Sequence, residues 1–221
     1  IYEQPKAIKD TLRGRLNVTK GIIKMSGMDD YINKFLSAKK ITIIACGTSW
    51  HSALVAEYMF EKISKIPVEV EYASEFRYRD PIIEKDDIII AISQSGETAD
   101  TLAAIKLAKS KGAFIYGICN VVGSSIARES DSGSYTHAGP EIGVASTKAF
   151  TTQMTVLYMM AVKLSKSKGI ISEKLFQKYL LEISNIDKKV HHALSSNNEI
   201  KKIAKKFLTA TNCLYLGRGY N

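Results

Sequence analysis

The chain has 221 residues, which by length is one large domain with at most part of a second. Hydrophobic residues make up 45% of the sequence and charged residues 24%, a balance that allows a sizeable core and excludes the disordered and collagen-like classes. No apolar run approaches the ~18 residues of a membrane span, so we expect no membrane partner. The first residues lack the apolar segment of a secretory signal. The three cysteines lack metal-ligand spacing, which favours a cytoplasmic location without disulfides and without a metal site.

The net charge is +9, from 31 basic and 22 acidic residues. The lysines are scattered as pairs along amphipathic segments, for example Lys39-Lys40 and Lys205-Lys206, as on solvated helix faces. A surface for nucleic acid would instead require clustered arginines or a recognisable helix-turn-helix pattern. The sequence has neither, and we expect no nucleic-acid partner.

Two helices are expected first, over residues 5–16 and 28–38. From residue 41 onward, short β-branched runs alternate with amphipathic stretches, the pattern of parallel strands buried on both faces. The predicted strands cover residues 41–45, 67–71, 87–92, 113–118 and, more weakly, 132–136. Between the first four strands, helices are predicted over residues 49–63, 73–79 and 98–111. Strands joined by helical crossovers run parallel, so the predicted fold class is α/β: a doubly wound five-stranded parallel sheet with flanking helices, in the flavodoxin-like order 2-1-3-4-5.

After the sheet, the pattern predicts a long apolar helix over residues 147–167, either a core helix or a surface for a second copy. Charged helices follow over residues 172–194 and 197–208, and then a last strand over 213–216. That strand and its turn, NCLYLG, repeat the first strand and turn, ITIIACG. We therefore predict three parts: an N-terminal hinge and helices (1–40), the main domain with its C-terminal helices (41–209), and the start of a truncated second, similar domain (210–221).

Two hydroxyl-rich turns follow predicted strands and open helices, where free N–H groups bind anions. The first turn contains Cys46, Gly47, Thr48 and Ser49, and the second contains Ser93, Gln94, Ser95 and Thr98. Helix capping alone would account for the first turn but not for the second. In the order 2-1-3-4-5 the two turns are neighbours at the switch point where such folds bind ligands. Without a Walker lysine or a G-x-G-x-x-G string, they suit a phosphate monoester held with neither metal nor cofactor, and a sugar phosphate is the natural candidate.

A third stretch, GPEIGVASTK at residues 139–148, is rich in small residues. Close backbone approach to a ligand and a plain loop ending in a Ser/Thr cap would each explain it. Lys148 is either a ligand contact or a solvated or paired lysine. Glu97 and Glu141 are the carboxylates nearest the expected site, and we interpret Glu97 as a first-turn residue favoured by the helix dipole, not as a catalytic base. The histidines are interpreted as helix or loop residues: His51, His137, His191 and His192.

Five segments carry a resemblance to a known family: ACGTS, ASEFRYRD, SQSGETADT, ICNVVGSSIARESD and EIGVASTKAFTTQ. In this order they resemble the isomerase domain of the glutamine:fructose-6-phosphate amidotransferases, also called glucosamine-6-phosphate synthases, over nearly the whole chain. The resemblance implies a sugar isomerase (SIS) domain. It implies that the phosphate is held by Ser93, Gln94, Ser95, Thr98 and Ser49. It implies that the sugar is faced by Cys46, Gly47, Thr48, Val144 and Ser146.

In this family, an N-terminal glutaminase domain releases ammonia from glutamine, and the isomerase half forms glucosamine 6-phosphate from fructose 6-phosphate. The family's base, ring-opening histidine and imine-forming lysine lie in the second SIS domain and the C-terminal tail. The resemblance therefore implies no catalytic residue in this chain, and we expect it to bind sugar phosphate without turnover. It also implies a cytoplasmic homodimer, with the glutaminase domain and the second SIS domain as further partners.

Two other functions fit the same motifs. A stand-alone SIS module would sense a sugar phosphate and regulate a partner. A sugar-phosphate isomerase complete in one SIS domain would need an acid–base pair near the phosphate turn, with Glu97 or His137 as candidates.

Overall fold

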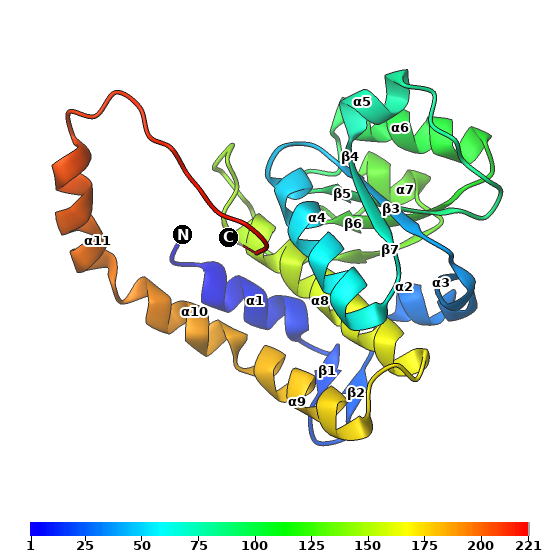
Figure 1. Ribbon diagram of the computed structural model, residues 1–221, viewed down its shortest axis with the longest axis horizontal. Coiled ribbons are helices and arrows are strands. Elements are labelled where there is room, and N and C mark those ends of the chain that lie inside the picture. Colours follow the sequence, from blue (N-terminus) through cyan, green and yellow to red (C-terminus); the bar gives the residue numbers. More distant parts are fainter. Residues whose placement is uncertain (221) are drawn as a thin grey trace.

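The computed structural model describes residues 1–220, and its centre is a five-stranded parallel sheet (Figure 1). The strands are β3 (Ile41–Ala45), β4 (Val68–Tyr72), β5 (Ile88–Ser93), β6 (Phe114–Cys119) and β7 (Ser132–Tyr135). Their order is β4-β3-β5-β6-β7, which confirms the predicted order 2-1-3-4-5. The connections contain α4 (Gly47–Met59), α5 (Ala73–Tyr78), α6 (Ala99–Ser110) and α7 (Ser125–Glu129).

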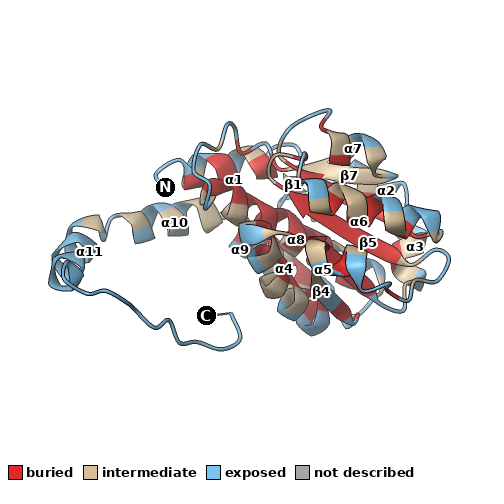
Figure 2. Ribbon diagram, turned by 90° about the horizontal axis from the view of Figure 1, so that it is seen from above, coloured by how far each residue is buried: buried red, intermediate tan, exposed pale blue. Residues whose placement is uncertain are grey.

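Side chains alternate along each strand and fill two cores, one on each face of the sheet. Ile41 and Ile43 of β3 belong to the core that includes α4, α1 (Gln4–Leu12) and α8 (Lys148–Ser167). Ile44 points to the other face and packs with α5, α6 and α7. Because helices cover both faces, β3, β5 and β6 are buried at every residue (Figure 2). This is the pattern on which the prediction of a parallel sheet depended.

Helix α8 is the central helix of the first face, so of the two alternatives left open for it the structure favours the core helix. It packs against α1 and α4, and Val156, Met159 and Met160 are fully buried on it. Helix α1 shares the same core through Ile8 and Leu12. The N-terminal residues and the sheet therefore fold as one packed body.

The N-terminal helices differ from the prediction. Helix α1 ends at Leu12 because Gly14 takes a left-handed backbone, φ +73°, and a two-stranded antiparallel hairpin follows. Its strands are β1 (Leu16–Asn17) and β2 (Ile22–Ile23). The predicted helix 28–38 is two helices, α2 (Ser26–Asp29) and α3 (Ile32–Ser37). The break occurs at Tyr31, which leaves helical geometry and places its ring against Phe114, with centroids 4.8 Å apart.

Later helix boundaries also shift. Helix α4 begins at Gly47 and continues as a π-helical turn, η1 (Phe60–Ser64), which stops where Lys65 adopts φ +52°. The predicted helix 172–194 is split at Asn185, whose side chain donates to the Leu181 carbonyl at 2.9 Å. Its two parts are α9 (Glu173–Ser184) and α10 (Ile186–Leu194). The last predicted helix shortens to α11 (Asn197–Ala204) and the 3₁₀ turn η2 (Lys205–Phe207).

The predicted strand at residues 213–216 is wrong. These residues are irregular and exposed, and no strand within residues 1–220 lies beside them to form a ladder. The segment has the apolar composition of a strand, but a strand needs a neighbouring strand to pair with its backbone N–H and C=O groups.

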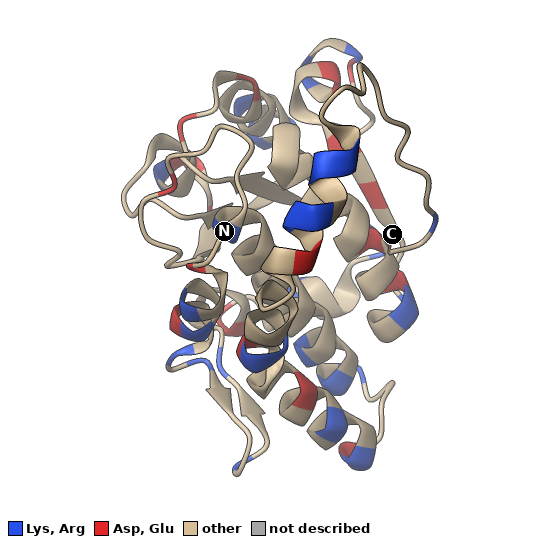
Figure 3. Ribbon diagram, turned by 90° about the vertical axis from the view of Figure 1, so that its left-hand side faces the viewer, with Lys and Arg blue, Asp and Glu red and all other residues tan. Residues whose placement is uncertain are grey.

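Basic side chains are spread over several helices and are not gathered on one face (Figure 3). Many of them pair with carboxylates nearby, as Lys40 does with Glu69 at 2.8 Å. None of the helices in the described chain is long and apolar enough to cross a membrane.

Candidate functional site

The two hydroxyl-rich turns lie next to each other at the carboxyl ends of β3 and β5. These strands are hydrogen-bonded neighbours, with Ala45 opposite Ile92, so Cys46 and Ser93 leave the sheet side by side. Thr101 Oγ1, in the first turns of α6, lies 3.9 Å from Cys46 Sγ and links the second turn to the first. The prediction that the two turns lie next to each other is confirmed.

The second turn, residues 93–98, is held by its own hydroxyl groups. Ser93 is only 3% exposed, and its Oγ accepts from Gly96 N at 2.9 Å and lies 3.0 Å from Thr98 Oγ1. Ser95 Oγ accepts from Glu97 N at 3.2 Å. Thr98 is the N-cap residue of α6, yet its side chain makes no capping bond within residues 1–220. The first amides of α6 therefore keep their partial positive charge for an anion.

Helix α7, which the sequence did not predict, braces this turn. Gly96 has φ +70°, and Ser124 occupies the space beside it, so that a β-carbon on Gly96 would lie 2.0 Å from Ser124 Oγ. Glu97 Oε1 accepts from Ser125 N at 2.7 Å, and this hydrogen bond lowers the pKa of Glu97. Glu97 therefore caps α7 and does not belong to the first turn of α6, which corrects the prediction. The Ser124-Ser125 pair, a residue type typical of N-caps, is the sequence signal for this helix.

The first turn, residues 46–49, opens α4. Gly47 has φ +58°. Cys46 is the N-cap residue, and in the described structure its side chain leaves the helix uncapped. Ser49 is buried, at 5% exposure, and its Oγ accepts from Gln153 Nε2 of α8 at 2.9 Å. Gln153 Oε1 accepts in turn from Ser52 Oγ at 3.1 Å. Ser49 thus has a fixed rotamer and still has its own O–H to donate.

The third predicted stretch lies over the first turn. Ser146 Oγ and Thr48 Oγ1 are 2.7 Å apart, so the loop before α8 closes on the start of α4. Val144 is fully exposed, with a side chain that makes no core contact. Only the family resemblance predicted that Thr48 and Ser146 belong to one site, because no local sequence pattern links residues so far apart in the chain.

Glu141 and Lys148 both have partners at the start of α8. Glu141 Oε2 accepts from Thr147 N at 3.2 Å and from Ala149 N at 3.1 Å, a capping role that the sequence did not predict. Lys148 is buried and forms an ion pair with Glu3, so of the alternatives left open for it the structure favours a paired lysine.

The second turn also touches the third stretch through Asn120, which the sequence did not single out. Asn120 N donates to the carbonyl of Gln94 at 3.2 Å, and its side chain donates to the carbonyl of Gly139 at 2.8 Å. Asn120 Oδ1 accepts from Ala138 N at 2.8 Å. Asn120, which follows β6, therefore joins the second turn, through its backbone N–H, to the loop that closes on Thr48, through its side chain.

Together these segments present backbone N–H groups from two helix N-termini and several hydroxyl groups to one place at the sheet edge. Such donors bind an oxyanion without a metal. Among residues 1–220, no three His, Cys, Asp or Glu side chains are grouped so that they could hold a metal ion. The roles of the individual residues in binding phosphate or sugar stay predictions.

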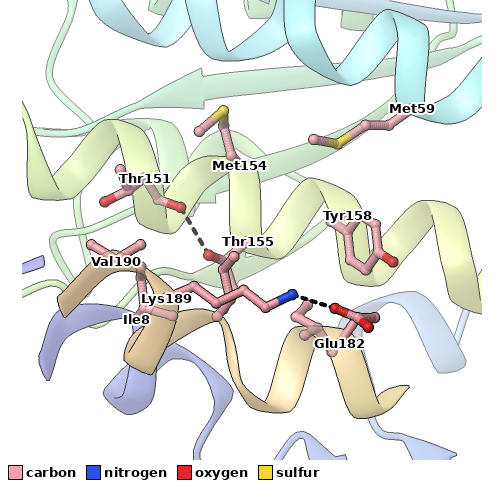
Figure 4. A pocket seen from close by; sticks show the side chains of 11 residues that line it. Ile8, Met59, Thr151, Met154, Thr155, Tyr158, Glu182, Lys189 and Val190 are labelled. Atoms are coloured by element: carbon pink, nitrogen blue, oxygen red, sulfur yellow. Dashed lines mark hydrogen bonds and ion pairs between the residues drawn. The ribbon is translucent and has the colours of Figure 1, made fainter. Parts of the chain in front are cut away.

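A separate apolar pocket of about 320 Å³ lies between α1, α8, α9 and α10 (Figure 4). Met154 and Tyr158 of α8 line it, and an ion pair between Lys189 and Glu182 crosses its rim. Met59, another lining residue, ends α4, whereas Thr48 lies in its first turn, about 16 Å away along a helix axis that rises about 1.5 Å per residue. This pocket is therefore distinct from the hydroxyl-rich site.

The chain matches the family model of the SIS domain over residues 34–163. It is 56% identical to the glutamine–fructose-6-phosphate aminotransferase (isomerizing) of Chlorobaculum tepidum and 55% identical to that of Bacteroides thetaiotaomicron, over 100% of this chain and 36% of each relative. The chain thus spans about a third of the length of these curated relatives. Among solved structures, the C-terminal domain of glucosamine-fructose-6-phosphate aminotransferase from Francisella tularensis is similar, with a TM-score of 0.92 and 41% identity, over 99% of this chain and 61% of that chain. With the parallel sheet and its paired turns, these matches show that the chain belongs to the SIS domain family.

Proposed function

We propose that this chain is the first SIS domain of an isomerizing glutamine–fructose-6-phosphate aminotransferase, and that it binds the phosphate end of fructose 6-phosphate or glucosamine 6-phosphate. The observation that carries the proposal is the pair of helix N-termini, α4 and α6, that meet at neighbouring strand ends among hydroxyl groups. A phosphate monoester fits this set of donors. The relatives, named for fructose 6-phosphate, support the choice of sugar.

In this proposal the two turns and the loop divide the ligand between them. The phosphate is assigned to Ser93, Gln94, Ser95, Thr98 and Ser49. The sugar is assigned to Cys46, Gly47, Thr48, Val144 and Ser146. The two groups adjoin because β3 and β5 are neighbours and because Ser146 meets Thr48.

Binding without turnover is part of the proposal. Glu97 is the carboxylate of the second turn, but Ser125 N donates to it and lowers its pKa, which makes it a weaker base at neutral pH. The pKa of His137 is lowered by burial and by Arg15, and no contact joins its ring to the turn in the described structure. Both observations disfavour an isomerase complete in one SIS domain. In the whole enzyme, we place the chemistry in the second SIS domain, with the glutaminase domain, a second copy of the chain and a cytoplasmic location completing the assignment.

The test is the thermal unfolding midpoint with and without millimolar fructose 6-phosphate, in the wild-type chain and in the Ser95→Ala/Thr98→Ala double variant. A ligand that binds only the native state raises the midpoint, and at a hundred times Kd it adds about 2.7 kcal/mol. We expect a rise in the wild type that disappears in the double variant. Ser110→Ala, at the opposite end of α6, is the matched control and should keep the rise. A folded wild type without any shift would contradict the proposal.

A further inference from the structure

The loop before α8, residues 139–147, is anchored at its far end by a carboxylate. Glu141 Oε2 accepts from the backbone N–H groups of Thr147 and Ala149 at 3.2 Å and 3.1 Å. The N-cap residue Thr147 supplies no side-chain capping bond of its own to any described residue. Glu141 therefore satisfies the amides that open α8 and folds the loop back on itself.

Lys148, the first residue of α8, is a cation in an unfavourable place. It is 7% exposed and lies at the positive end of the helix dipole, where burial and the dipole both disfavour an ammonium group. Its Nζ forms an ion pair with Glu3, whose side chain is 70% exposed. The hydrogen bond from Lys148 lowers the pKa of Glu3, so the carboxylate is charged at neutral pH. The pair joins the segment before α1 to the end of the loop.

The N-terminal segment also holds the other end of the same loop, through Thr11 of α1 and through Arg15, which follows it. Thr11 Oγ1 donates to the carbonyl of Thr136 at 2.5 Å, and Arg15 Nη2 donates to the carbonyl of Tyr135 at 2.6 Å. Tyr135 ends β7, and the chain runs from there into the loop. The N-terminal segment thus contacts the chain immediately before and after the loop that meets Thr48.

We infer that the Glu3–Lys148 ion pair and Glu141 are positioning contacts for the sugar-binding loop, and that through them the N-terminal segment sets the affinity of the site for the sugar moiety. The inference rests on the proposed function, which assigns this loop to the sugar. Ser146 of the loop bonds Thr48, whereas the hydroxyl groups of the second turn bond within that turn. Loss of the ion pair should therefore weaken contacts to the sugar and leave contacts to the phosphate intact.

The experiment measures Kd by isothermal titration calorimetry for two probes, fructose 6-phosphate and inorganic phosphate. We expect Glu3→Gln to weaken the binding of fructose 6-phosphate about fivefold, because the carboxylate of the pair is largely exposed, and to leave the Kd of inorganic phosphate unchanged. Asp10→Asn is the matched control, because it removes ion pairs within the same N-terminal segment, with Lys6 and Arg13, and leaves the Glu3–Lys148 pair in place. It should change neither Kd.

A double-mutant cycle separates the ion pair from general loss of structure. In the Lys148→Met background the buried charge is gone, so Glu3→Gln should have no further effect on fructose 6-phosphate binding. Glu141→Ala should weaken fructose 6-phosphate binding, and Glu141→Gln should restore part of it, because the amide oxygen still accepts from Thr147 N and Ala149 N. Without any ligand, hydrogen exchange of these two amides should be faster in Glu3→Gln than in the wild type.

The outcomes are distinguishable. An equal loss of affinity for both probes in Glu3→Gln would overturn the inference, and so would unchanged affinities together with unchanged exchange rates. If the wild type binds inorganic phosphate but not fructose 6-phosphate, the sugar assignment fails and the inference with it. If the wild type binds neither probe, the proposed function itself is refuted.

Discussion

Replacing Gly96 by alanine tests how the second turn is built. Gly96 has φ +70°, and a β-carbon there would lie 2.0 Å from Ser124 Oγ and 2.4 Å from Ser124 Cβ. A left-handed backbone costs an alanine about 1–2 kcal/mol. Overlap with a buried side chain costs about 1–3 kcal/mol more. We therefore expect Gly96→Ala to lower the free energy of unfolding by about 2–5 kcal/mol, the sum of these two costs.

Gly47→Ala is the matched control, because Gly47 also has a left-handed backbone in a turn after a strand, φ +58°, but no described atom lies within 4 Å of its β-carbon position. It should lose only the backbone cost of about 1–2 kcal/mol. Urea unfolding with linear extrapolation measures both variants. The double variant Gly96→Ala/Ser124→Gly should recover much of the packing cost. Equal losses for Gly96→Ala and Gly47→Ala would refute the argument that Ser124 fills the place of a β-carbon.

Three further measurements test the surroundings of the site. The folded-state pKa of Glu97 lies below its ordinary value of 4.5, so its contribution to stability is present above pH 4.5 and is lost as the pH falls through the lower folded-state value. Glu97→Gln should therefore reduce the fall of the thermal midpoint at acid pH. An unchanged fall would speak against the cap on α7. Gln153→Met leaves Ser49 without its buried donor and should lower the free energy of unfolding, measured in urea, by about 1–3 kcal/mol. The rise of the thermal midpoint with fructose 6-phosphate should also be smaller. An unchanged free energy of unfolding would show that Ser49 needs no such partner. Burial raises the pKa of Cys119 to about 11. At about pH 8, iodoacetamide should therefore label the exposed Cys213 first and Cys119 only on unfolding, which peptide mass spectrometry measures. Early labelling of Cys119 would contradict its burial.

The sheet could be predicted because its strands are apolar on both faces, and each observed strand begins or ends within one residue of its prediction. Segments whose structure depends on distant neighbours were predicted less well. The break at Tyr31 depends on its contact with Phe114, which lies far along the chain. The strands of the β1–β2 hairpin are too short to show a period of two. Residues 213–216 have the composition of a strand but are irregular, and no strand within residues 1–220 pairs with them.

The candidate site divides in the same way. The two turns could be found because hydroxyl residues follow two strands that the predicted topology makes neighbours. The side chains that fix the turns could not, since Gln153 reaches Ser49 across 104 positions and Glu3 reaches Lys148 across 145 positions of sequence. Such pairs depend on how α1, α4 and α8 pack, which no local pattern records.

The parallel sheet also has a kinetic consequence. No two neighbouring strands in it are joined by a hairpin, and Ile41 must meet both Val68 and Ile88 before β3 is paired on its two sides. Long loops have to close before these contacts form, so folding is expected on a scale of about milliseconds to seconds. During synthesis, β3 and β4 are the first strands of the parallel sheet that can pair, with α4 between them. The turn at residues 93–98 lacks its brace until Ser124 and α7 have been made, so we expect this turn to reach its native form late.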